Sequence, residues 1–192
     1  LVEGDIDAVG GQVVLTVDSQ RRAAAARNHT ATHLMHQALR DVLGDHVGQM
    51  GSLVGPDRLR FDFSHFAAME PGQVQEVEGA VNEKIRQDLE VETREEDLDR
   101  AKEMGARALF GEKYDQRVRL VCVGDYSLEL CGGTHVDSTG RIGSFDLLAE
   151  SGIAAGTRRA EALTGEGAEA MVRFRRDTLA RLGAALNAQP DE

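Results

Sequence analysis

The amino-acid sequence predicts an α+β fold in which helices pack against a largely antiparallel sheet. Apolar residues recur at helical spacing over residues 20–43. Apolar and polar residues alternate instead over 59–63, which is the period of a strand with one buried face. Two short apolar runs separated by a Gly-Asp pair predict a hairpin over 117–131. Local helices next to antiparallel strands define the fold class.

The elements follow in order along the chain. Val13 to Val17 reads as a strand that Asp18 ends, and the helix at 20–43 has Gly44 as its expected C-cap. The later elements are a strand at 59–63, a helix from Pro71 to about Leu89 (with the proline in the first turn, where it is tolerated), a strand at 90–94, a short helix at 96–104, the hairpin at 117–131, strands near 142–149 and 157–163, and an amphipathic helix at 166–187 carrying Met171, Phe174, Leu179, Leu182 and Leu186.

Composition places the chain among globular proteins with a real core. It has 192 residues, of which 41% are hydrophobic and only 4% aromatic, so aliphatic side chains must do the packing. Its two cysteines do not suggest a disulfide framework, and in the expected hairpin Cys122 does not face Cys131. A reduced, cytoplasmic setting is therefore expected. The sequence shows neither a run of about 20 apolar residues, as a membrane span needs, nor a secretory leader.

The net charge of −11 is unevenly distributed. Residues 67–104 contain 12 acidic and 5 basic residues, whereas residues 20–60 contain 6 basic and 3 acidic residues. A local basic region on an acidic protein is compatible with a nucleic-acid partner. For any single arginine, an ordinary solvated surface remains the simpler interpretation.

Two short histidine motifs carry the strongest chemical signal. His29 and His33 are four residues apart within the predicted helix, so their imidazoles share one face. About a hundred residues later, Cys131 and His135 flank two glycines and a threonine. Either motif alone is weak evidence, but together they supply three imidazoles and one thiolate, a donor set that suits Zn²⁺. Thr30 stands where a metalloprotease HExxH motif has its glutamate, which argues against protease chemistry.

Four ordered blocks carry a family resemblance. They are RNHTATHLMHQAL at 27–39, GQMGSLVGPDRLRFDF at 48–63, LCGGTHVDSTGRIGSF at 130–145 and GTRRAEALTG at 156–165. Together they resemble the editing domain of alanyl-tRNA synthetase. Free-standing alanyl-tRNA editing proteins are similar too, and the threonyl-tRNA synthetase editing domain shares only the zinc-ligand pattern.

The resemblance implies a function and a domain organisation. It implies hydrolysis of the ester in mischarged Ser-tRNA(Ala) and Gly-tRNA(Ala), with zinc in the site, the tRNA(Ala) acceptor end as partner, and the rest of a synthetase attached. It also implies three segments: 1–19 as the end of a β-barrel, 20–164 as the zinc-containing editing domain, and 165–192 as the start of a helical arm. A free-standing deacylase and a non-catalytic, zinc-stabilised tRNA-binding module remain alternatives.

Three residues are candidates for contacting the substrate. The resemblance favours Thr32 and Gln49, and Thr30 is the third. The two threonine hydroxyls could instead bond to a backbone carbonyl one turn earlier, and Gln49 could be a solvated loop residue. The glycines Gly132 and Gly133 could admit the terminal adenosine or merely form a tight turn.

Four further residues are expected to be structural. His36 lies on the face of His29 and His33 but one turn further along, which favours a supporting or packing role. The other three are His46 and His65, read as ordinary surface or satisfied histidines, and Cys122, read as a small core residue.

Overall fold

A computed structural model describes residues 14–108 and 114–186 of the chain. The α+β class is confirmed, but the strands form two antiparallel sheets instead of one. In chain order the elements are α1 (Ser19–Leu43), β1 (Gln49–Val54), β2 (Leu59–Ser64), α2 (Pro71–Arg86), β3 (Val91–Asp97), α3 (Leu98–Glu103), β4 (Arg117–Val123), β5 (Ser127–Leu130), the 3₁₀ helix η2 (Thr139–Ile142), β6 (Phe145–Ala154), β7 (Thr157–Thr164) and α4 (Glu166–Leu186).

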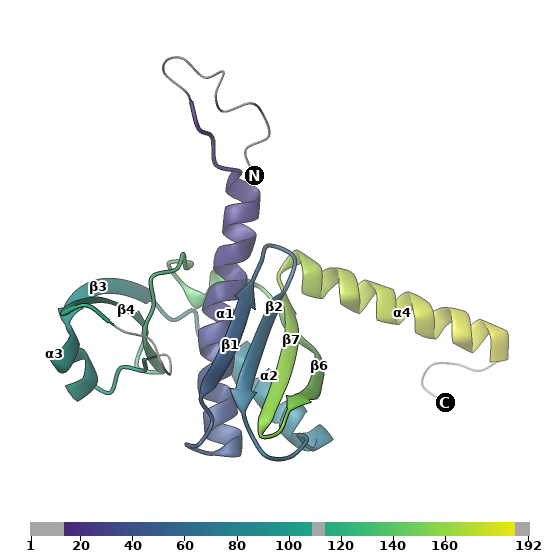
Figure 1. The fold of residues 1–192 in the computed structure, drawn as a ribbon. Coiled ribbons are helices and arrows are strands. Elements are labelled where there is room, and N and C mark those ends of the chain that lie inside the picture. The colour runs from purple at the N-terminus through teal and green to yellow at the C-terminus, as the bar shows by residue number, and fades with distance from the viewer. Residues whose placement is uncertain (1–13, 109–113, 187–192) are drawn as a thin grey trace, which may run out of the picture.

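Helix α1 stands between the two sheets. On one side lies the four-stranded sheet, in the order β1-β2-β7-β6, and on the other lies a smaller lobe built from β3-β4-β5 and α3 (Figure 1). The side chain of Asp18 caps α1 by accepting hydrogen bonds from the backbone N–H groups of Gln20 and Arg21. At the other end, Gly44 has φ 112°, a left-handed value that favours glycine, as the sequence led us to expect.

The main core forms where α1 and α2 cover the four-stranded sheet. Leu59, Phe61 and Phe63 are fully buried on β2, as their alternation predicted. The intervening Asp62 is also buried, and its charge is compensated by Arg159 of β7, which donates two hydrogen bonds to its carboxylate at 2.7 and 2.8 Å. From α2 the buried residues are Val77, Val81 and Ile85, which follow helical spacing.

The smaller lobe has its own core, around Ala101, Val118, Leu120 and Leu130. Its hairpin pairs Cys122 with Leu128, so the predicted offset between the two cysteines is confirmed, and both are free. Cys122 packs against this core, partly buried, as expected of a small apolar residue.

The prediction of a strand at 13–17 was wrong for the described part of that segment. Residues 14–17 have no strand, and Val14 and Leu15 are 91% and 80% exposed. A strand requires a neighbour for its backbone hydrogen bonds, and none of the described strands lies beside this segment. Asp18 therefore starts a helix instead of ending a strand. Residues 1–13, which make up most of the expected barrel remnant at 1–19, lie outside the described residues.

Strand β1 was missed by the sequence analysis, which placed Gln49 in a loop. This strand pairs with β2 at the edge of its sheet, with an irregularity between Gln49 and Gly51. Its small and polar residues mask the alternation of a strand, and none of its six residues is fully buried. Tertiary pairing with β2, not local preference, makes this segment a strand.

Several element boundaries also differ from the prediction. Helix α2 ends at Arg86 instead of about Leu89, because Asp88 has φ 48°, outside the helical region. Strand β3 is longer than expected, and β6 begins at Phe145 after η2 instead of near 142.

Helix α4 confirms the predicted C-terminal helix but projects away from the sheet (Figure 1). Only Ala168 is buried on it, and Phe174, Leu182 and Leu186 are more than half exposed. None of the helices in the described ranges is long and apolar enough to cross a membrane.

A buried asparagine fixes α1 against the larger sheet. The side chain of Asn28 donates to the carbonyl of Gly55 at 2.8 Å, beside the turn between β1 and β2. It also accepts a hydrogen bond from Thr164, at the end of β7, at 2.7 Å. Because Asn28 is only 1% exposed, these bonds cannot be replaced by water without reorganisation.

We therefore expect Asn28→Ala to lower the free energy of unfolding by about 2 kcal/mol, since it leaves buried partners without hydrogen bonds. Urea unfolding followed by circular dichroism measures this loss. The exposed Gln75→Ala provides the control and should change stability little. Equal stability of the two variants would contradict the role given to Asn28.

Candidate metal centre

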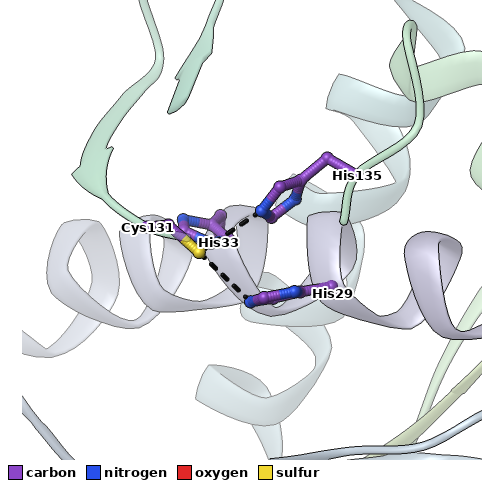
Figure 2. Close-up of side chains that lie close together, drawn as sticks. All are labelled: His29, His33, Cys131 and His135. Atoms are coloured by element: carbon purple, nitrogen blue, oxygen red, sulfur yellow. Dashed lines mark hydrogen bonds between the residues drawn. The ribbon is translucent and has the colours of Figure 1, made fainter. Parts of the chain in front are cut away.

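Four side chains that are distant in sequence meet beside α1. His29 and His33 come from that helix, while Cys131 and His135 come from the segment directly after β5 (Figure 2). Their potential ligand atoms all lie within 4.8 Å of one another. The structure thus brings together the four residues that the two motifs singled out.

Two of the distances between these atoms match those of a tetrahedral metal site, within a set that spans at most 4.8 Å. Cys131 Sγ lies 3.4 Å from His29 Nε2 and 3.4 Å from His135 Nε2. Ligand–metal distances of 2.0–2.3 Å around zinc place neighbouring ligand atoms about 3.3–3.8 Å apart. One thiolate with three imidazoles is also a donor set that zinc accepts. The four residues therefore fit the metal that the sequence predicted.

The segment carrying Cys131 is held by a neighbouring strand. Arg119 of β4 donates from Nη1 to the carbonyls of Cys131 and Gly133, both at 2.7 Å. The backbone N–H of Gly133 points back to Cys131 Sγ at 3.4 Å. These bonds fix the turn that aims the thiol at α1.

Gly133 is needed for close approach to the helix. A Cβ at this position would collide with the His29 ring, at Cε1 and Nδ1, whereas a Cβ at Gly132 would meet nothing within 4 Å. Of the two glycines, Gly133 therefore has a steric role in the metal centre, and Gly132 lies in open space.

The charges around the thiol favour the metal-binding form. Burial raises the pKa of Cys131, but hydrogen bonds from His135, His29 and His33 outweigh burial and lower the pKa to about 3. Burial lowers the pKa of His135 to about 4, despite its hydrogen bond to Cys131. Cys131 is consequently a thiolate and His135 a neutral imidazole at neutral pH, as metal ligation requires.

Glu129 is the residue of this site that the sequence analysis missed. It is 5% exposed, and its two oxygens lie 3.0 Å from His33 Nδ1 and 3.1 Å from His36 Nδ1. Although burial alone would raise the pKa of Glu129, His33 and His36 hold it well below its usual range. A carboxylate behind a ligating histidine orients its ring and raises its basicity. The one feature of the sequence that could have indicated this role is the position of Glu129, an acid between two leucines and two residues before Cys131.

His36 therefore does not join the four ligands but supports them through Glu129, in line with the supporting role expected of it. His46 and His65 are satisfied histidines, also as expected, because His46 Nε2 lies 2.8 Å from His65 Nδ1.

The two threonines of the ligand helix make internal hydrogen bonds. Thr30 is fully buried, and its hydroxyl lies 3.1 Å from His135 Nδ1 and accepts from the backbone N–H of Val136 at 3.2 Å. Thr32 donates to the carbonyl of Asn28 at 2.8 Å, which is the structural alternative for this residue. Thr30 thus orients the ring of His135 at its other nitrogen.

Two cavities flank the ligand cluster along α1. One, of about 540 Å³, is lined by His135 and by three arginines, Arg22, Arg27 and Arg141. The other, of about 360 Å³, lies towards the C-terminal end of α1 and contains Gln49 and His36 in its wall. Arg22 and Arg27 in the wall of the first cavity belong to the basic region predicted for residues 20–60. The second cavity contains Gln49, the glutamine expected to contact a substrate.

Comparison with known proteins identifies relatives over most of the chain. Residues 118–161 match the family described as "Threonyl and Alanyl tRNA synthetase second additional domain". The alanine–tRNA ligase of Acetivibrio thermocellus is 59% identical over 159 residues, covering 83% of this chain and 18% of the relative. That of Pelotomaculum thermopropionicum is 54% identical over 180 residues, covering 94% and 20%. That of Bacillus cytotoxicus is 55% identical over 168 residues, covering 88% and 19%.

These matches confirm the resemblance to alanyl-tRNA synthetase that the four sequence blocks indicated. The chain spans about a fifth of the length of the curated relatives it matches. The matched domain contains Cys131 and His135, while His29 and His33 precede it in the chain.

The steric role of Gly133 predicts the effect of a single methyl group. Gly133→Ala should weaken Zn²⁺ binding by about tenfold or more, the range seen when residues supporting a ligand are changed. Titration against a chromophoric zinc chelator measures the affinity. The matched Gly132→Ala should bind zinc like the unaltered chain, and equal affinities of the two variants would contradict the close-approach argument.

Metal affinity should also depend on pH through His33. Burial lowers the pKa of His33, but the Glu129 carboxylate and Cys131 outweigh burial and raise it to about 9. The proton on His33 competes with the metal, so affinity should rise about tenfold per pH unit between pH 6.5 and 8.5 and level off above 9. Calorimetry in buffers of different ionisation enthalpy should detect release of about one proton per metal at pH 7.5. Affinity that does not change with pH would show that His33 is already neutral.

Proposed function

We propose that this chain is the editing part of an alanine–tRNA ligase and hydrolyses the ester of mischarged Ser-tRNA(Ala) and Gly-tRNA(Ala). The observation that carries the proposal is the convergence of His29, His33, Cys131 and His135 in a chain related to alanine–tRNA ligases. The match to the synthetases' second additional domain supports the same assignment. The activity belongs to the cytoplasm, where aminoacyl-tRNA is used.

The proposed metal is zinc, held by the four converging side chains. A zinc ion in a hydrolytic site can polarise a carbonyl and lower the pKa of bound water. Sites with four protein ligands are usually structural, whereas catalytic sites keep one position open. We therefore propose that the four ligand side chains, with the metal they would hold, fix the shape of the pocket. The group that activates water is left unassigned.

The proposed partner is the acceptor end of tRNA(Ala). The cavity next to His135 supports this assignment, because Arg22, Arg27 and Arg141 line it beside a ligand of the metal. Arg141 is already paired with Asp137 at 2.6 Å, so Arg22 and Arg27 are the better candidates for phosphate contacts. The remaining domains of the parent synthetase would supply further contacts.

The need for such a site follows from the energetics of small side chains. A pocket sized for alanine rejects glycine by only one methyl group, worth about 1–3 kcal/mol, and cannot strongly reject the added hydroxyl of serine. A second site that hydrolyses the wrong product restores accuracy. Such a site can spare alanine if it hydrogen-bonds the serine hydroxyl, since alanine would leave those polar groups unpaired.

Thr32, Gln49 and Thr30 stay predictions as residues that contact the substrate. Gln49 has the best support because it lines a cavity. Both threonine hydroxyls already have partners within the protein, so a substrate would have to share or displace them.

The proposed division of the chain is unchanged: a barrel segment at 1–19, the editing domain at 20–164 and a helical arm from 165 to 192. The exposed apolar residues of α4 support an arm that is covered by other parts of a longer protein.

One alternative is favoured by a specific observation. Four protein ligands leave no open position on a tetrahedral metal, as in a structural site. The chain would then be a zinc-stabilised tRNA-binding module without catalysis. A free-standing deacylase is the other alternative and predicts the same chemistry.

The deciding experiment measures deacylation of three substrates by the zinc-loaded chain. We expect hydrolysis of Ser-tRNA(Ala), slower hydrolysis of Gly-tRNA(Ala) and sparing of Ala-tRNA(Ala). The double variant His29→Ala with Cys131→Ala should lose its zinc and at least about a hundredfold in rate. The Cys122→Ala variant, which changes the other cysteine, should keep both. Tight tRNA binding without any hydrolysis would favour the non-catalytic module, and rapid hydrolysis of Ala-tRNA(Ala) would overturn the editing assignment.

A further inference from the structure

The loop at 44–48, which joins α1 to β1, is held by an arginine of the helix. Arg40 donates two hydrogen bonds from Nη1 to the backbone carbonyls of Asp45 and Val47, both at 2.7 Å. Its Nη2 donates to the Asp45 carboxylate at 2.8 Å. Because the Asp45 side chain is 99% exposed, water screens this ion pair and its contribution is small. The two bonds to backbone carbonyls are therefore the ones that fix the loop.

Ser64 of β2 holds the remaining peptide groups of the 44–48 loop. Its hydroxyl donates to the carbonyl of His46 at 2.8 Å and accepts from the backbone N–H of Gly48 at 2.9 Å. Its own backbone N–H donates to the carbonyl of Gly48 at 3.0 Å. Arg40 and Ser64 together thus provide a donor for every backbone carbonyl from residue 45 to residue 48, directly before Gln49.

The side chain of Gln49 depends on this backbone for its position. Gln49 lies in the wall of the cavity of about 360 Å³, together with Arg40 and Ser64. Its amide makes no hydrogen bond to another side chain or to the backbone within residues 14–108 and 114–186. An amide without such partners is free to bind a ligand, but only its backbone and its packing can aim it. Whatever fixes the 44–48 loop therefore fixes the direction of this amide.

Arg40 also relates the loop to the candidate metal centre. It lies seven residues after His33 on α1, and residues seven apart on a helix share a face. The rise of the helix separates them by about 10.5 Å along its axis. One helix thus carries a ligand of the proposed metal and the arginine that holds the loop before Gln49.

We propose that Arg40 is a positioning residue for deacylation, which fixes the 44–48 loop so that the amide of Gln49 faces a substrate bound beside the metal centre. The inference rests on the proposed ester hydrolysis and on the predicted contact between Gln49 and the substrate. It also separates Arg40 from the other arginines of the basic region at 20–60, because its guanidinium binds the protein backbone and not a phosphate of the tRNA.

Three single variants separate the carbonyl bonds from the ion pair. Arg40→Met keeps the length of the side chain and removes all three hydrogen bonds, whereas Asp45→Asn removes the charge of the partner and keeps its carbonyl. We expect Arg40→Met to lower kcat for Ser-tRNA(Ala) by about tenfold to a hundredfold, the range that a small misplacement of a group at the substrate produces. Its KM should change little, because Arg40 does not contact the tRNA. Asp45→Asn should keep nearly full kcat, and Arg40→Lys, which still carries donors, should recover part of the loss.

Combination with Gln49→Ala tests whether Arg40 acts through Gln49. If it does, Arg40→Met should lower kcat in the unaltered chain but cause no further loss in a chain that already carries Gln49→Ala. An arginine that only stabilises the fold would lower activity in both backgrounds. Losses that multiply in the double variant, or full activity of Arg40→Met or of Gln49→Ala alone, would overturn the proposal.

Amide hydrogen exchange reports on the same loop without catalysis. The N–H groups of Val47 and Gly48 should exchange at least about tenfold faster in Arg40→Met, the effect of losing about one hydrogen bond. They should exchange normally in Asp45→Asn. Unchanged exchange in Arg40→Met would contradict the role given to this arginine. Zinc content and exchange around His29 should match the unaltered chain in both variants.

Failure to fold and failure of the proposed function give different results. If Arg40→Met loses zinc or helical circular dichroism, Ser64→Ala enters the same cycle with Gln49→Ala, because it removes the hydroxyl bonds that hold the loop from the side of β2. An unaltered, zinc-loaded chain that hydrolyses none of the substrates would refute the deacylase and with it this role of Arg40. An active unaltered chain with a folded and equally active Arg40→Met would refute the positioning role alone.

Discussion

Helix α1 is held between two sheets, and the four ligand side chains meet only while it stays there. Asn28 ties the helix to the turn between β1 and β2 and to the end of β7. On the opposite side, Arg119 holds the segment after β5 so that Cys131 and Gly133 face the helix. The candidate metal centre therefore depends on contacts to both sheets, although its ligands lie on α1 and in the segment after β5 and not within a strand.

The burial of Glu129 imposes a second constraint. An isolated carboxylate in a buried position costs several kcal/mol, as an effective penalty, unless other groups compensate it. Here His33, His36 and Arg107 surround it at 3.0 to 3.6 Å. One acid thus joins a proposed metal ligand to the wall of a cavity, and the protonation of each partner influences the others. This arrangement couples the candidate metal centre to the wall of the neighbouring cavity.

The sequence was most informative where chemistry and local structure coincide. His29 and His33 fall on one helical face by spacing alone, and Cys131 and His135 are confined by a short glycine-containing segment. Strand β1 could not be predicted, because Gly51 and Ser52 carry no alternation and the strand exists through pairing with β2. Residues 13–17 show the opposite error. Their valine-rich composition predicted a strand, but residues 14–17 have no described strand beside them to pair with.

Glu129 and Gly133 show the limit of sequence reasoning at the site. An acid in a short apolar strand is compatible with many contacts, and only the register of β5 against β4 and the position of α1 show that it meets two histidines. Likewise Gly132 and Gly133 are equivalent in sequence, and the packing of one against His29 distinguishes them.

The distance in sequence between the two ligand pairs has a mechanical consequence. His29 and Cys131 are 102 residues apart, and the intervening chain contains the whole of the smaller sheet and strands β1 and β2 of the larger one. A metal joining them closes this stretch into a loop, as a cross-link does. For a disulfide, closing a loop of about 100 residues removes unfolded-state entropy worth roughly 4.7 kcal/mol. Both cysteines of the chain are free. A bound ion would therefore be the cross-link between the smaller lobe and α1, and its release should loosen the packing of the two lobes as well as the site.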